Sequence, residues 1–85
     1  MSFLIERRLR AVGRRLSSLR QELTITDDSR IRAMVSETPL ADEEHRDAER
    51  TSSAMARHRT DLIQSIARLE AEQDDLLDKL SAKRR

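Results

Sequence analysis

The side chains best suited to bind a metal in this 85-residue chain are its two histidines and their acidic neighbours. His45 and Glu49 are four residues apart, and His58 and Asp61 are three apart, so a helix would place each pair on one face. Each pair supplies only two ligands, and a chain with 16 carboxylates contains such spacings by coincidence. We therefore interpret both histidines as exposed residues of a charged helix and predict no metal site.

Adjacent carboxylates at Asp27-Asp28 and Asp74-Asp75 are residue types that could do acid–base chemistry. Such chemistry needs a water-excluding cleft that shifts a carboxyl pKa, and a thin helical structure provides none. The chain also has no cysteine, which removes thiolate nucleophiles and cysteine-ligated metals. We predict that the protein is not an enzyme and has no catalytic residues and no cofactor.

Three arginines, Arg7, Arg10 and Arg14, form a basic stripe about two helical turns long that could contact phosphates. The net charge is only +1, and Phe3 is the one aromatic residue that could stack on a base. We favour a solvated or protein-contacting face. Nucleic-acid binding remains an alternative, as does contact with an anionic membrane surface into which residues 3–5 would insert.

Composition restricts the fold to helices. One glycine and one proline leave little material for hairpins or phosphate-binding loops, and no apolar run approaches the ~20 residues of a membrane span. With 36% apolar residues and no disulfide, one domain of this size has a small core, and oligomerisation is a common way to stabilise such a fold. We predict an all-α protein with a single domain over residues 1–85.

The first segment carries an apolar seam in a heptad repeat, written a to g, with apolar residues at positions a and d. Beyond Leu23 the next seam positions are polar, and the apolar residues shift to Ile31, Met34 and Val35. Two interpretations remain open: one helix over about 2–36 with a slip in phase, or a break near 24–28. The predicted seam residues are Ile5, Leu9, Val12, Leu16, Leu19 and Leu23.

The clearest signal for the start of a helix is Thr38-Pro39, because threonine caps helices and proline suits the first helical position. We predict a turn over about 36–38 and a second helix over about 39–83. Its seam is apolar in the C-terminal half and weak between residues 45 and 60. The predicted d positions are Ala48, Met55, Leu62, Leu69 and Leu76, and the a positions are Ser52, Arg59, Ile66, Gln73 and Leu80.

Two such helices predict an antiparallel two-helix hairpin with coiled-coil packing. A turn centred near residue 38 sets Leu16 opposite Leu62, because facing residue numbers then sum to about 77. Charge runs in blocks: +5 over residues 1–20, −6 over 21–49, +3 over 50–69, −5 over 70–78 and +4 over 79–85. In that register only part of the charge pairing is complementary.

Further apolar residues beside the seam predict an interaction surface. A second copy packing on it would form a dimeric four-helix bundle, although another helical protein could cover the same residues. We therefore interpret the chain as a non-enzymatic protein–protein interaction module. The predicted surface consists of Leu4, Ala11, Ala56, Ile63, Ala67 and Leu77.

Two resemblances bear on function. The run from Ser36 to Ala41, the stretch from His45 to Ala56 and the heptads from Leu69 to Leu80 resemble small uncharacterised coiled-coil proteins of actinobacteria, which implies a cytoplasmic bacterial protein. The hairpin with acidic residues 42–44 at its tip resembles the N-terminal coiled coil of bacterial transcript-cleavage factors, which reach into the polymerase secondary channel. This resemblance implies the alternative of binding to the transcription machinery.

Overall fold

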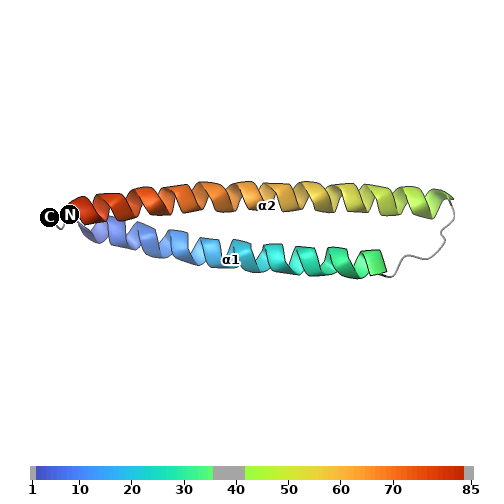
Figure 1. The fold of residues 1–85 in the computed structure, drawn as a ribbon, viewed down its shortest axis with the longest axis horizontal. Coiled ribbons are helices and arrows are strands. Elements are labelled where there is room, and N and C mark those ends of the chain that lie inside the picture. The colour runs from blue at the N-terminus through green and yellow to red at the C-terminus, as the bar shows by residue number, and fades with distance from the viewer. Residues whose placement is uncertain (1, 36–41, 84–85) are drawn as a thin grey trace.

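The computed structural model describes residues 2–35 and 42–83, which form two long helices (Figure 1). Helix α1 spans Ser2–Val35 and helix α2 spans Asp42–Lys83, and the described residues contain no strand. The start of α1 and the end of α2 lie together at one end of a rod measuring 65 × 16 × 14 Å, so the helices are antiparallel. The expected all-helical fold is confirmed, while the expected turn and helix start at residues 36–41 lie outside the described part.

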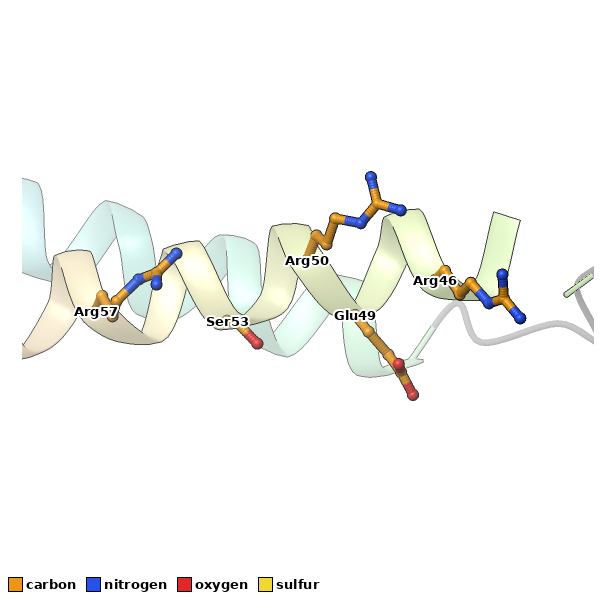
Figure 2. A pocket seen from close by; sticks show the side chains of 5 residues that line it. All are labelled: Arg46, Glu49, Arg50, Ser53 and Arg57. Carbon is orange, nitrogen blue, oxygen red and sulfur yellow. The ribbon is translucent and has the colours of Figure 1, made fainter. Parts of the chain in front are cut away.

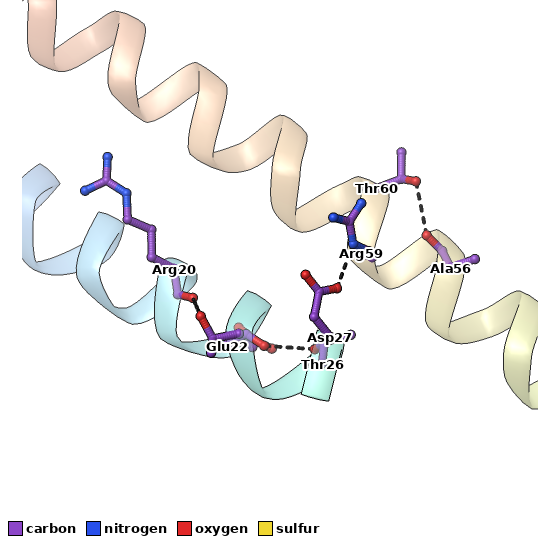
Figure 3. A network of polar contacts seen from close by, with 8 residues as sticks. Arg20, Glu22, Thr26, Asp27, Ala56, Arg59 and Thr60 are labelled. Atoms are coloured by element: carbon purple, nitrogen blue, oxygen red, sulfur yellow. Dashed lines mark hydrogen bonds and ion pairs between the residues drawn. The ribbon is translucent and has the colours of Figure 1, made fainter. Parts of the chain in front are cut away.

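Helix α1 runs without a break through residues 24–28. The hydroxyl of Thr24 donates to the Arg20 carbonyl at 3.1 Å. The hydroxyl of Thr26 donates to the Glu22 carbonyl at 2.9 Å (Figure 3). These bonds satisfy the threonine hydroxyls inside the helix. Asp27, a residue type that could have capped a new helix, instead accepts a hydrogen bond from α2. The first of the two sequence interpretations, a single helix, therefore describes α1.

The core lies along the predicted seam of both helices. Leu16 and Val12 are each only 1% exposed, and partly buried Leu23, Leu69 and Leu76 pack against the same cluster. Burial of each such aliphatic side chain contributes at most ~1.5–3 kcal/mol. The buried side chains among the described residues are Val12, Leu16, Leu19, Leu62, Ile66 and Leu80, and all of them occupy predicted a or d positions.

Beyond Leu23 the packing keeps its heptad phase instead of following the apolar residues. Thr26 is half-buried, whereas Ile25 and Ile31 are 58% and 59% exposed. The segment of α2 at this level offers half-buried Met55 and Arg59 among exposed residues, so a turn of the isoleucines toward α2 would gain little apolar burial. The predicted slip in phase is therefore absent from the packing.

The register of the hairpin differs from the predicted one. Arg8 pairs with Glu72, and Arg20 pairs with Glu70, so the residue numbers of contacting positions sum to 80 and 90 instead of about 77. Leu80, only 9% exposed, would have no opposite residue at all in the predicted register. Facing residue numbers sum to about 85, which is a shift of about one heptad.

This register sets Leu16 level with Leu69 and Leu19 level with Ile66, instead of Leu16 level with Leu62. It also explains why Leu76 packs against the central cluster. The prediction assumed that the connection between the helices fixes the alignment. In the structure the packed half of the hairpin, far from the connection, determines it.

The end of the hairpin near the connection has little packing. Every residue from Asp42 to Ala54 is exposed, and so is every residue of α1 from Asp28 to Arg32. The start of α2 also extends past the end of α1 (Figure 1). The seam position Ala48 therefore contributes nothing to a core, in line with the weak seam predicted for residues 45–60.

We expect Leu16→Asp to abolish most of the helical structure, because it places a charge at the most buried position of a core with few members. Ser18→Asp, at an exposed position on the same helix, is the matched control. Circular dichroism with thermal melting measures both variants. Equal helicity and melting of Leu16→Asp and the wild type would contradict this assignment of the core.

Candidate functional site

Ion pairs between the helices identify the two sides of the hairpin. Arg8 and Glu72 both occupy g positions, as do Glu22 and His58, whose carboxylate and imidazole lie 3.2 Å apart. The pair of Arg20 with Glu70, at 3.8 Å, joins two e positions. In an antiparallel pair of helices, e positions meet on one side of the seam and g positions on the other. We refer to these as the e side and the g side.

The innermost of these contacts is a polar layer within the seam. Arg59, at an a position, donates from Nε to the Asp27 carboxylate at 2.7 Å (Figure 3). The two side chains are 37% and 36% exposed, so both keep part of their hydration. The pair ends the apolar core at this level without burying an unpaired charge.

The g side carries the contact with the strongest electrostatic effect. Arg8 donates to both oxygens of Glu72, one of these bonds being 2.8 Å long from Nη2. The hydrogen bonds from Arg8 hold the pKa of Glu72 below its ordinary value, and the same bonds raise the pKa of Arg8. A bidentate arginine–carboxylate pair also fixes geometry, so this contact helps to hold the register.

The g side forms a ladder with a missing rung. Arg8 with Glu72 and Glu22 with His58 are rungs whose residue numbers sum to 80, and Arg15 with Ser65 is the pair between them. Ser65 is half-buried and accepts a hydrogen bond from Arg68 at 3.1 Å, while Arg15 makes no ion pair within the described residues. The middle rung therefore lacks a charge pair.

The predicted interaction surface divides between the two sides. Ile63 and Leu77, 40% and 49% exposed, occupy e positions of α2 together with exposed Ala56, and Ala67 lies beside them at a b position. Leu4, 68% exposed, lies at a c position of α1, which is next to g on the other side.

Ala11, at a c position like Leu4, is half-buried. The six residues therefore do not form one continuous surface. The α2 members form the larger group, and they share the e side.

Three large exposed apolar residues were not among the predicted surface residues: Phe3, Ile25 and Ile31. Their exposed fractions are 61%, 58% and 59%. Phe3 and Ile31 occupy b positions, on the e side of α1, while Ile25 is at a c position on the g side. The signal was present in the sequence, because the uninterrupted heptad phase would have assigned Ile25 and Ile31 to the outside.

The basic stripe is as exposed as predicted. Arg7, Arg10 and Arg14 all lie on the surface of α1, and within the described residues none of them makes an ion pair. An open hollow on α2 gathers more arginine, from Arg46, Arg50 and Arg57 (Figure 2). Figure 2 shows that these guanidinium groups do not converge on one point, and all of them come from a single helix. The hollow does not form a binding site for a single ligand.

Each histidine contacts a carboxylate on the surface of the hairpin. His45 lies 2.9 Å from Glu49, as the spacing predicted, but His58 contacts Glu22 across the hairpin instead of Asp61. Asp75 pairs with Lys79 at 3.0 Å. Among the described residues no group of three or more potential metal ligands comes together.

The described helices contain no stretch that is both long and apolar enough to cross a membrane. Comparisons with protein-family models, with curated proteins and with solved structures gave no match to this chain. Its function must therefore be argued from the surface of the hairpin itself.

We expect Ser65→Glu to raise the thermal stability of the hairpin, because a carboxylate at this position completes the g-side ladder opposite Arg15. An exposed pair of this kind contributes ~0.2–1 kcal/mol. The melting temperature at low salt measures the gain, and Ser65→Glu in an Arg15→Ala background separates the contact across the hairpin from a local one with Arg68. A gain of the same size in both backgrounds would show that Arg15 is not the partner.

The Arg8–Glu72 pair predicts a specific dependence on pH. Because the pKa of Glu72 is lowered by folding from an ordinary value of 4.5, the pair stabilises the hairpin above pH 4.5, and this contribution is lost as the pH falls through the lower folded-state pKa. We expect the wild type to be more stable than Glu72→Gln at pH 7, and the difference to disappear in strong acid. Denaturant unfolding at several pH values measures it, and a constant difference would contradict the prediction.

Proposed function

We propose that this chain is a non-enzymatic protein–protein interaction module, which acts by self-association of the hairpin into an antiparallel dimer with four helices. The observation that supports this most is the exposure of large apolar side chains on a very thin fold. Phe3, Leu4, Ile25 and Ile31 are all more than half exposed, and Ile63 and Leu77 are 40% and 49% exposed. Exposed apolar residues in such numbers are typical of a surface that another helix covers.

The small size of the core supports the same proposal. Six side chains are buried among the described residues, and two helices have only each other to pack against. Ordering each residue costs ~1.5 kcal/mol of conformational entropy, which makes a lone hairpin of this length marginal. A second copy would add apolar burial without any increase in chain length.

The resemblance to small coiled-coil proteins of actinobacteria supports a cytoplasmic location, which we include in the proposal. It also supports the absence of enzymatic activity, since the residues that carry that resemblance contain no catalytic motif. The engagement of Asp75 and both histidines in surface ion pairs is consistent with this assignment.

A second candidate function is binding to a nucleic acid or to the transcription machinery. The observation that favours it is the unpaired state of Arg7, Arg10 and Arg14 within the described residues, which leaves three guanidinium groups available for phosphates. The exposed acidic residues 42–44, where α2 extends past α1, are the corresponding feature for a protein partner with a basic channel. We rank this candidate second because the stripe has no aromatic side chain among its arginines.

Self-association is tested by analytical ultracentrifugation of the purified protein over a wide range of concentrations. We expect the mass to rise from that of a monomer to that of a dimer while circular dichroism shows increasing helicity. A well-folded monomer at the highest concentration would refute the proposal. The exposed apolar residues would then be assigned to the binding of a different protein.

The second candidate is tested with the triple variant Arg7→Glu, Arg10→Glu and Arg14→Glu. We expect wild type and variant to bind neither DNA nor RNA at physiological salt, and the variant to retain its fold, because exposed charges contribute little to stability. Fluorescence anisotropy with a labelled oligonucleotide measures binding. Binding by the wild type that the triple variant loses would establish the stripe as a nucleic-acid site.

A further inference from the structure

We propose that the second copy packs on the e side of the hairpin, with α2 of one copy antiparallel to α2 of the other and the two-fold axis close to Ile63. This inference rests on the proposed self-association and specifies which surface and which orientation the dimer uses. It follows from three independent features of the described residues: a second stripe on α2, the order of charge along that helix and the space above Gly13.

The second stripe consists of Ala56, Thr60, Ile63 and Ala67, spaced by four, three and four residues. This spacing repeats the pattern of the seam on a different face of the same helix. All four residues are exposed, and Ile63 stands among three small side chains. The hydroxyl of Thr60 donates to the Ala56 carbonyl at 3.1 Å, so covering it would leave no unsatisfied donor (Figure 3).

The order of charge along α2 identifies a second copy as the occupant. On the e side and the outer face of α2, residues 50–59 carry Arg50 and Arg57, and residues 67–76, at equal distance on the other side of Ile63, carry Glu70 and Asp74. An antiparallel copy therefore meets opposite charge on both sides of Ile63, whereas a parallel copy would meet like charge there.

Some of these charged groups remain available for such contacts. Arg57 and Asp74 are exposed and make no ion pair within the described hairpin. Arg57 lies on the basic side of Ile63, and Asp74 lies on the acidic side. In the antiparallel arrangement the arginine of each copy approaches the acidic segment of the other.

The same axis brings complementary shapes together on α1. In the hairpin register Ile63 is level with Glu22, and Gly13 and Ile31 lie nine residues on either side of Glu22. Both face the e side, so Ile31 of one copy lies over Gly13 of the other. A side chain added at Gly13 would meet nothing within 4 Å, and Ile31 is 59% exposed. The exposed Ile31 side chain of one copy can therefore occupy the free space at Gly13 of the other.

The g side is a poorer surface for the same partner. It is occupied by the contacts of Arg8 with Glu72 at 2.8 Å and of Glu22 with His58 at 3.2 Å, whereas the e side carries the longer contact of Arg20 with Glu70 at 3.8 Å. Covering those charged groups would remove their hydration at a cost in free energy. Its large exposed apolar residues, Leu4 and Ile25, are 21 residues apart on α1 and form no continuous stripe.

Single cysteines provide a direct test, because the chain has none of its own. We expect Ile63→Cys to form a covalent dimer readily under mild oxidation or with a short bismaleimide. Thr60→Cys and Ala67→Cys, each one turn from the axis, retain Ile63 and serve if Ile63→Cys weakens association. The matched control is Ile25→Cys, since this isoleucine is at the level of Thr60 on the opposite side and is similarly exposed.

Crosslinking at residues 60, 63 and 67 with little at residue 25 is the expected result. Efficient crosslinking through residue 25 alone, in a protein that sediments as a dimer, would overturn the interface while leaving self-association intact. A monomer in the ultracentrifuge would refute the proposed function as well. The two failures are therefore distinguishable.

Salt gives an independent measurement on the wild-type protein. Because oppositely charged blocks meet along α2, we expect the dissociation constant of the dimer to rise roughly tenfold between low and high salt, as screening weakens the attraction. Circular dichroism at high protein concentration checks that the hairpin itself stays folded. A dimer whose affinity is unchanged or strengthened by salt would overturn the antiparallel charge pairing.

Discussion

A seam that repeats every seven residues allows two helices to align in more than one way, and the choice among these alignments is the constraint on which this hairpin depends. Moving one helix by a heptad keeps a and d positions facing each other. The same movement would set Arg8 opposite Ser65 and Arg15 opposite His58, so the contacts of Arg8 with Glu72 and of Glu22 with His58 would both be lost. These surface pairs, each weak, thus act together with the burial of Leu80 to select the observed alignment.

The sequence was sufficient to predict the residues of the seam but not their alignment. Apolar spacing identified Leu16 and Ile66 as core residues because burial follows the heptad directly. The alignment was wrong because it was measured from the connection. In the observed alignment the acidic residues 70–78 face the basic residues 7–15. Asp27 shows a related difficulty. Aspartate can cap a helix locally, but the Asp27 carboxylate instead accepts a hydrogen bond from Arg59, which is distant in sequence.

The sequence was sufficient to predict which residues belong to the candidate surface, but not on which side of the hairpin each of them lies. Ile63 and Leu77 were identified because they are apolar positions outside the seam, and both are exposed. Their separation from Leu4 onto a different side follows only when the handedness of the antiparallel pair is known, which the ion pairs reveal. The contact of His58 with Glu22 is likewise a consequence of register, so no local spacing could have indicated it.

The uneven distribution of the core along the rod has a consequence for how the hairpin opens. The buried side chains lie toward the end where α1 begins and α2 ends, whereas residues 28–32 and 42–54 have none. Local opening therefore costs least where the helices approach their connection, and the backbone amides there should exchange with solvent through small fluctuations, while those around Leu16 exchange only on global unfolding. The two helices can therefore separate and re-form their contacts near the connection while the core at the opposite end stays folded.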